Sequence, residues 1–154
     1  MRPHIALIPG AWHSGDAYDT LLPFLHSQGY ETTALTLPSV GAEPPLTSLD
    51  PEIEYIRGKI VPLLEKGQDV VVVMHSYGGF AGSAALHGLS KAEREKEGQT
   101  GGVVSLVYLA AWLLDEGKAM LGSGGGSPGA LGMSVFRIEV CRHCDVPTPL
   151  TISG

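Results

Sequence analysis

The chain has 154 residues, of which 44% are hydrophobic and 17% charged, a composition typical of one globular domain and not of a disordered chain. With 10 basic and 16 acidic residues its formal net charge is −6, so it lacks the basic surface that nucleic acid or an anionic membrane would require. We therefore expect a domain that handles a neutral or weakly charged small molecule.

The sequence shows neither a membrane-spanning segment nor a secretion signal, because the apolar run at residues 5–8 is too short for either. A cytoplasmic location is the expectation. The cysteines, Cys141 and Cys144, do not make a disulfide framework, and with His143 they offer too few ligands for structural zinc. We expect no metal and no cofactor, and the oligomeric state stays open.

The first third of the chain predicts a strand, a helix and a second strand. Residues 4–8 are apolar and rich in isoleucine, which indicates a buried strand. Residues 16–28 have helical periodicity, with Asp16 as the N-cap and Gly29 as the stop. Pro23 predicts a kink or a late start in this helix. A second strand is expected over residues 31–37.

A helix and a buried strand follow. After a loop at residues 38–49, Asp50 is predicted to cap a helix, with an acidic residue, Glu52, near the positive end of its dipole. Gly67 ends that helix. Residues 69–74 contain four consecutive valines, and a strand that is apolar on both faces is typical of a parallel sheet between helices.

The remaining elements complete an alternating pattern. We expect a helix over residues 79–89, a charged linker over 91–102 and a buried strand over 103–109. Strands that alternate with helices predict an α/β fold, a three-layer sandwich with a parallel sheet flanked by helices on both faces.

The most informative segment surrounds Ser76, which stands between the valine strand and a helix. In a nucleophile elbow the serine occupies a strained strand-to-helix turn that exposes its hydroxyl. Small residues are needed around it, and Gly78 and Gly79 satisfy this on one side. Met74 stands where the general motif has glycine.

Such a turn also supplies hydrogen-bond donors for an oxyanion. The amide of Tyr77 would be free at a helix N-terminus, and the amide of Ala11, in the loop after the first strand, is the second candidate. Loss of one such donor typically costs about 3 kcal/mol of transition-state stabilisation.

The same residues also fit an ordinary strand-to-helix turn, because short serine motifs have many chance matches. The buried strand before Ser76 and the glycine-bearing loop upstream favour the catalytic interpretation. In that loop Trp12 and His13 are candidates to line a pocket, and so is His75 beside the serine.

Three segments of the chain, residues 8–13, 75–79 and 107–111, resemble the α/β-hydrolase superfamily. The likeness is to its small esterases, the group of plant methyl esterases, hydroxynitrile lyases and related fungal hydrolases. It runs from about residue 4 to residue 117, and the three segments occur in the order of the family.

The resemblance implies that Ser76 is the nucleophile and that the amides of Ala11 and Tyr77 form the oxyanion hole. It implies hydrolysis of a carboxylic ester or related acyl small molecule through an acyl-enzyme, without a cofactor. Lyases of the group tend to have threonine at the Ala11 position, so the alanine favours ester hydrolysis.

The family places its acid and its histidine after the nucleophile, beyond the span available here. Asp115 and Glu116 follow the fourth strand, where some hydrolases place the acid, but residues 113–117 resemble a lid-entry loop, which favours a solvated turn. No predicted element positions His143, which is therefore interpreted as a chance histidine. We expect residues 1–117 to be the N-terminal part of a hydrolase domain and the glycine-rich residues 118–154 to be a flexible tail unlike the family, as in a truncated product.

Two alternatives to an esterase therefore stay open. One is an inactive fragment or pseudoenzyme that only binds a small ligand, since a triad enzyme without its base loses most of its rate. The other is an enzyme of the hydroxynitrile lyase type on the same scaffold.

Overall fold

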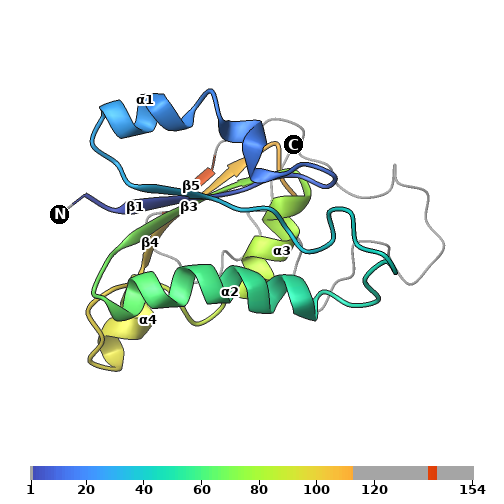
Figure 1. Ribbon diagram of the computed structural model, residues 1–154. Coiled ribbons are helices and arrows are strands. Elements are labelled where there is room, and N and C mark those ends of the chain that lie inside the picture. Colours follow the sequence, from blue (N-terminus) through green and yellow to red (C-terminus); the bar gives the residue numbers. More distant parts are fainter. Residues whose placement is uncertain (1, 113–138, 142–154) are drawn as a thin grey trace, which may run out of the picture.

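The computed structural model describes residues 2–112 and 139–141, which form one sheet in the order β2-β1-β3-β4-β5 (Figure 1). Neighbouring strands from β2 to β4 run parallel, whereas β5 is antiparallel to β4. The strands are β1 (His4–Ile8), β2 (Thr32–Ala34), β3 (Val70–His75), β4 (Val103–Leu109) and β5 (Glu139–Cys141).

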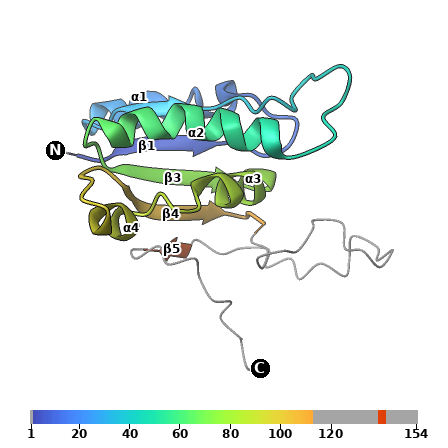
Figure 2. The same ribbon diagram turned by 90° about the horizontal axis from the view of Figure 1, so that it is seen from below.

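Helices cover both faces of this sheet. Helix α1 lies on one face, and α2, α3 and α4 lie on the other (Figures 1 and 2). The predicted α/β fold with three layers is therefore confirmed. The helices are the 3₁₀ helix η1 (Gly15–Tyr18), α1 (Leu22–Ser27), α2 (Asp50–Glu65), α3 (Tyr77–Leu86) and α4 (Lys91–Lys96).

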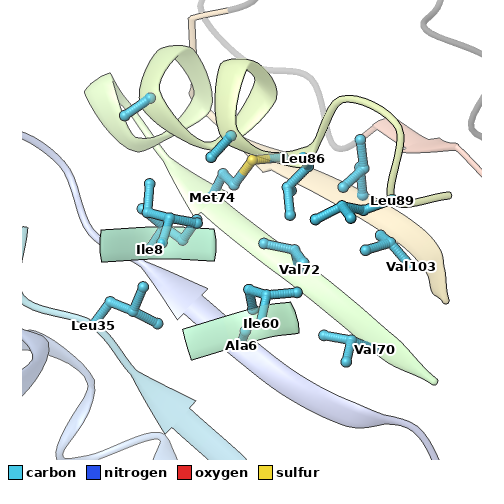
Figure 3. Close-up of a cluster of buried hydrophobic side chains, with 14 of the residues drawn as sticks. Ala6, Ile8, Leu35, Ile60, Val70, Val72, Met74, Leu86, Leu89 and Val103 are labelled. Carbon is cyan, nitrogen blue, oxygen red and sulfur yellow. The ribbon is translucent and has the colours of Figure 1, made fainter. Parts of the chain in front are cut away.

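The core lies between β3 and the helices on that second face. Val70, Val72 and Met74 point from β3 into it and are fully buried, and Ile60 of α2 packs there too (Figure 3). The register pairs Met74 with both Ile8 of β1 and Tyr108 of β4. The carboxyl ends of the three central strands therefore reach the same edge of the sheet, where parallel α/β proteins bind ligands.

Two strands match the prediction to the residue, and two elements are shorter than predicted. Strands β1 and β4 have the expected bounds, but the predicted helix at 16–28 is split into η1 and α1, with Pro23 in the first turn of α1. The predicted strand at 31–37 shrinks to β2. Beyond it the hydroxyl of Thr36 accepts a hydrogen bond from the Gly15 amide at 2.8 Å, so the chain turns toward η1.

The predicted cap of α2 is wrong. Asp50 is the first residue of the helix, Leu49 is its N-cap, and no side chain caps it. The Ser48 hydroxyl instead donates to the Asp50 carboxylate at 3.0 Å and accepts from the Asp50 amide at 3.3 Å, which draws the carboxylate away from the helix end.

Two further elements were not predicted. The charged segment after Ser90 was expected to be a linker but contains α4, where Ser90 and Glu93 form a reciprocal capping box. Strand β5 lies within the segment predicted to be a flexible tail, of which the other residues lie outside the described part. No helix in the described part is long and apolar enough to cross a membrane.

Candidate active site

Ser76 occupies a strained turn between β3 and α3. Its backbone has φ 50° and ψ −120°, a conformation that residues with a β-carbon rarely adopt and that costs about 1 to 3 kcal/mol. Hydrogen bonds hold the turn: its amide donates to Leu109 at 3.3 Å, and its carbonyl accepts from Gly79 and Trp112, both at 3.0 Å. The side chain is partly exposed, as an attacking hydroxyl requires.

Glycines after the turn allow α3 to begin against the end of β1. A β-carbon on Gly78 would lie 2.5 Å from the Pro9 carbonyl oxygen and 2.7 Å from that of Ile8. One on Gly79 would lie 2.7 Å from the carbonyl oxygen of Trp112. These are backbone atoms that cannot move aside, so both positions require glycine for the reason that the sequence suggested.

Met74, the departure from the general motif, is accommodated by a third glycine. Its side chain is fully buried and points toward α3 (Figure 3). A β-carbon on Gly82 would lie 2.6 Å from the Met74 sulfur and 3.0 Å from the Ile8 side chain. Because Gly82 of α3 has no side chain, it leaves the space that Met74 occupies before the turn.

The loop after β1 lies directly beside Ser76. A β-carbon on Gly10 would be 3.1 Å from the Ser76 β-carbon, so only a glycine allows this approach without a shift of the serine. The His13 amide donates to the Gly10 carbonyl at 3.2 Å, and Trp12 has φ 64°. Ala11 therefore occupies the second position of a tight four-residue turn, next to the serine.

Tyr77 is the first residue of α3, where a backbone amide has no acceptor within its own helix. Its side chain points elsewhere: the hydroxyl donates to Glu52 Oε2 at 2.5 Å. Burial, together with this hydrogen bond and the Glu52 charge, raises the pKa of the Tyr77 phenol. Tyr77 thus joins the predicted oxyanion hole to the start of α2.

Glu52 was predicted only as an acidic residue near a helix end, and the structure buries it beside Tyr77. It is 1% exposed, and its Oε1 has no hydrogen-bond partner among the described residues. With Tyr77 it lines a cavity of about 530 Å³, whose other wall is the loop between Ser39 and Ser48. We call this space the Glu52 cavity.

The three pocket candidates occupy different environments. Trp12 is 91% exposed and does not line the Glu52 cavity. His13 Nδ1 is 2.8 Å from the Ala11 carbonyl, so the imidazole holds its own loop. The exposed His75 packs beside Gly10, whose β-carbon position is 3.0 Å from the His75 ring nitrogen. Their role in a pocket stays a prediction, and Asp115, Glu116 and His143 lie outside the described residues.

The chain is similar in sequence to a known protein family and to individual members of it. Residues 5–143 match the family described as "Alpha/beta hydrolase family". The chain is 36% identical over 122 residues to "Alpha/beta hydrolase nvfD" of Aspergillus novofumigatus, which covers 79% of this chain and 48% of the relative. It is 33% identical over 87 residues to "Methyl jasmonate esterase 1" of Vitis vinifera, which covers 54% of this chain and 33% of that protein.

Among solved structures, a polyneuridine aldehyde esterase variant superimposes with a TM-score of 0.60 at 20% identity. The match covers 79% of this chain and 45% of that chain, and it shows a shared fold. The chain spans about half (48%) of the length of the Aspergillus relative.

Proposed function

Because the chain belongs to the alpha/beta hydrolase family, we propose that it carries the nucleophile of a serine hydrolase, Ser76. The substrate is a carboxylic ester or a related acyl small molecule. The observation that carries this proposal is the positive φ of Ser76 at the end of a buried strand, with Gly10 packed against its β-carbon. Strain of this kind clusters at active sites because the surrounding structure maintains it for function.

In the proposed reaction, Ser76 Oγ attacks the acyl carbon, and the proton that the hydroxyl loses ends on the leaving alcohol. The carbonyl oxygen becomes an oxyanion that accepts hydrogen bonds from the amides of Ala11 and Tyr77. The bond to the leaving alcohol then breaks, the alcohol departs with a proton, and the acyl group remains on the serine. Water releases the acid in a second step.

The comparisons favour an ester among acyl substrates. The Vitis relative is named for its action on a methyl ester, and this chain has alanine rather than threonine at position 11. A second candidate is a non-catalytic chain that keeps the site and binds a small ligand.

A burst assay with p-nitrophenyl acetate tests the proposal and separates it from the alternatives. An acyl-enzyme on Ser76 gives a rapid release of p-nitrophenolate, up to about one equivalent of protein, even where deacylation is slow. The Ser76→Ala variant, folded by circular dichroism, should lack the burst. A wild-type protein without burst or turnover supports the non-catalytic chain. Cleavage of a cyanohydrin without ester turnover indicates the lyase.

A further inference from the structure

We propose that the Glu52 cavity binds the protonated amine of a small molecule whose apolar part rests on the cavity wall. The inference rests on the proposed function in treating this cavity as part of the substrate site. It names the substrate class as cationic amines. Three features of the cavity carry it: an unpaired carboxylate oxygen, the sign of the surrounding charges and an apolar wall.

The first feature is the hydrogen bonding of Glu52. Oε2 accepts a hydrogen bond from the Tyr77 hydroxyl at 2.5 Å, whereas the buried Oε1 has no partner in residues 2–112 and 139–141. A buried acceptor without a donor is unfavourable by about 1 to 3 kcal/mol, and by more when it is charged. Such a group is rare in folded proteins, and it marks a position that a ligand donor would satisfy.

The second feature is the charge around it. No basic side chain in the described part of the chain forms an ion pair with Glu52. The described residues that line the cavity include a second acid, Glu43, and the serines Ser39 and Ser48, but no lysine, arginine or histidine. The field in the cavity is therefore negative, which favours a cation and disfavours a carboxylate.

The third feature is the apolar wall. Pro45, Leu46 and Tyr77 also line the cavity, so a ligand with an apolar body beside its amine can contact both kinds of surface. An ammonium group near the Tyr77 ring gains a cation–π contact as well. Tyr77 follows Ser76 directly in the sequence, at the start of α3.

Calorimetric titration with benzylamine, benzyl alcohol and benzoate tests the proposal, because the three share one ring and differ in the charge of the head group. We expect the affinity to fall in that order at pH 7. Benzoate binding as tightly as benzylamine, or saturable binding of none of the three, would overturn the inference.

Substitutions at Glu52 and Glu43 test where benzylamine binds. Glu52→Gln removes the negative charge with little change of shape and should weaken benzylamine by about tenfold, since charge-assisted hydrogen bonds are about twice as strong as neutral ones. The matched control Glu43→Gln, on an exposed residue of the loop, should change it by no more than about twofold. Equal effects of the two variants contradict the proposal.

If Glu52→Gln does not fold, Leu46→Trp tests whether the amine binds in the Glu52 cavity. Leu46 is 37% exposed at the cavity wall, so Leu46→Trp fills the cavity from outside and should weaken benzylamine by at least about tenfold. Unchanged binding contradicts the proposal. Ser76→Ala should bind benzylamine as the wild type does. Failure of the acylation burst together with intact amine binding would therefore refute the proposed function alone.

Discussion

Ala11 occupies the second position of a turn whose third residue, Trp12, has φ 64°, and whose ends are joined by the bond from the His13 amide to the Gly10 carbonyl. Proline is favoured at the second position of turns with a positive φ at the third, and a proline has no amide proton. Ala11→Pro should therefore keep the loop and delete one oxyanion donor. We expect the acylation burst to slow by about 10²- to 10³-fold.

The matched control is Ala11→Gly, which keeps the amide and should leave the burst rate within about threefold of wild type, far from the loss of an oxyanion donor. Thermal melts establish that both variants fold. A folded Ala11→Pro protein with an unchanged burst would show that the Ala11 amide is not an oxyanion donor.

Tyr18 links η1 to the strand that leads into this loop, since its hydroxyl donates to the Ile8 carbonyl at 3.1 Å. Burial raises the pKa of the Tyr18 phenol to about 12, above its ordinary value of 10.0. The folded state therefore holds a proton that the unfolded state releases first. The contribution of the protonated Tyr18 phenol to the free energy of unfolding is complete below pH 10 and is lost as the pH rises toward about 12.

Urea unfolding of wild type and Tyr18→Phe at pH 8 and at pH 10.5 measures this effect. We expect the free energy of unfolding to decrease more for wild type than for the variant over that interval. Parallel decreases would show that the pKa of Tyr18 is the same in both states.

The spacing of residues along α2 indicates that Glu52 is buried, whereas its charge alone suggests that it is exposed. A glutamate near a helix start is ordinarily solvated and favoured by the dipole, which is how the sequence analysis placed it. Yet Glu52 stands four residues before Ile56, which is four before Ile60, and all three are buried on one stripe of α2. The helical period therefore pointed to its burial, whereas its tyrosine partner on α3 depends on tertiary packing.

At the scale of elements, the contact of β3 with α3 depends on the pairing of Met74 with Gly82. Gly82→Ala should destabilise the protein by about 1 to 3 kcal/mol, because the added carbon overlaps the Met74 sulfur. In a Met74→Ala background, Gly82→Ala should destabilise the protein by less. The difference between the two effects, the coupling energy, should be about 0.5 to 3 kcal/mol. Chemical denaturation of the two single variants and the double variant measures it.

Gly58→Ala in α2 is the control for this cycle. Apart from the backbone of its own helix and its chain neighbours, no atom of the described residues lies within 4 Å of a β-carbon at Gly58, so the substitution should stabilise the helix by up to about 1 kcal/mol. Additive effects of Gly82→Ala and Met74→Ala would contradict the account of how the large residue fits beside the turn.

The observed strands and helices also show which sequence signals were sufficient to predict secondary structure. Strands β1 and β4 were predicted to the residue, since the apolar run of β1 ends at Pro9-Gly10 and that of β4 begins directly after Gly101-Gly102. Helix α4 was missed although Ser90 and Glu93 have the spacing of a capping box, since the charged composition suggested a linker. Strand β2 was predicted too long because the departure of the chain toward η1 depends on a contact between Thr36 and Gly15 that is distant in sequence.

At the scale of the whole molecule, stability should be greatest in the central strands. Strand β3 is paired on both sides, by β1 and β4, whereas β2 has three residues and pairs only with β1 in the described part of the chain. We expect amides of β2 to exchange with solvent at least about tenfold faster than those of β3, since local opening begins where little surface is buried. Native-state hydrogen exchange tests this, and uniform protection would contradict it.

Membership of the family was predictable from three short segments, because the elbow and the loop beside it are local in sequence. The α/β fold was predictable from the alternation of strands and helices. The acid and base of a triad were not, since the family brings them from distant parts of the chain. In the proposed function Ser76 is the nucleophile and the amides of Ala11 and Tyr77 are the donors, so the proposal depends on whether the hydroxyl of Ser76 is reactive.

The most direct measurement is peptide mapping by mass spectrometry after exposure of the folded chain to a fluorophosphonate. The account predicts one adduct, on Ser76, which is lost in Ser76→Ala while the partly buried Ser83 of the same helix stays unlabelled. Folded protein that carries no adduct, or carries it on other residues at the same rate as on Ser76, would contradict it.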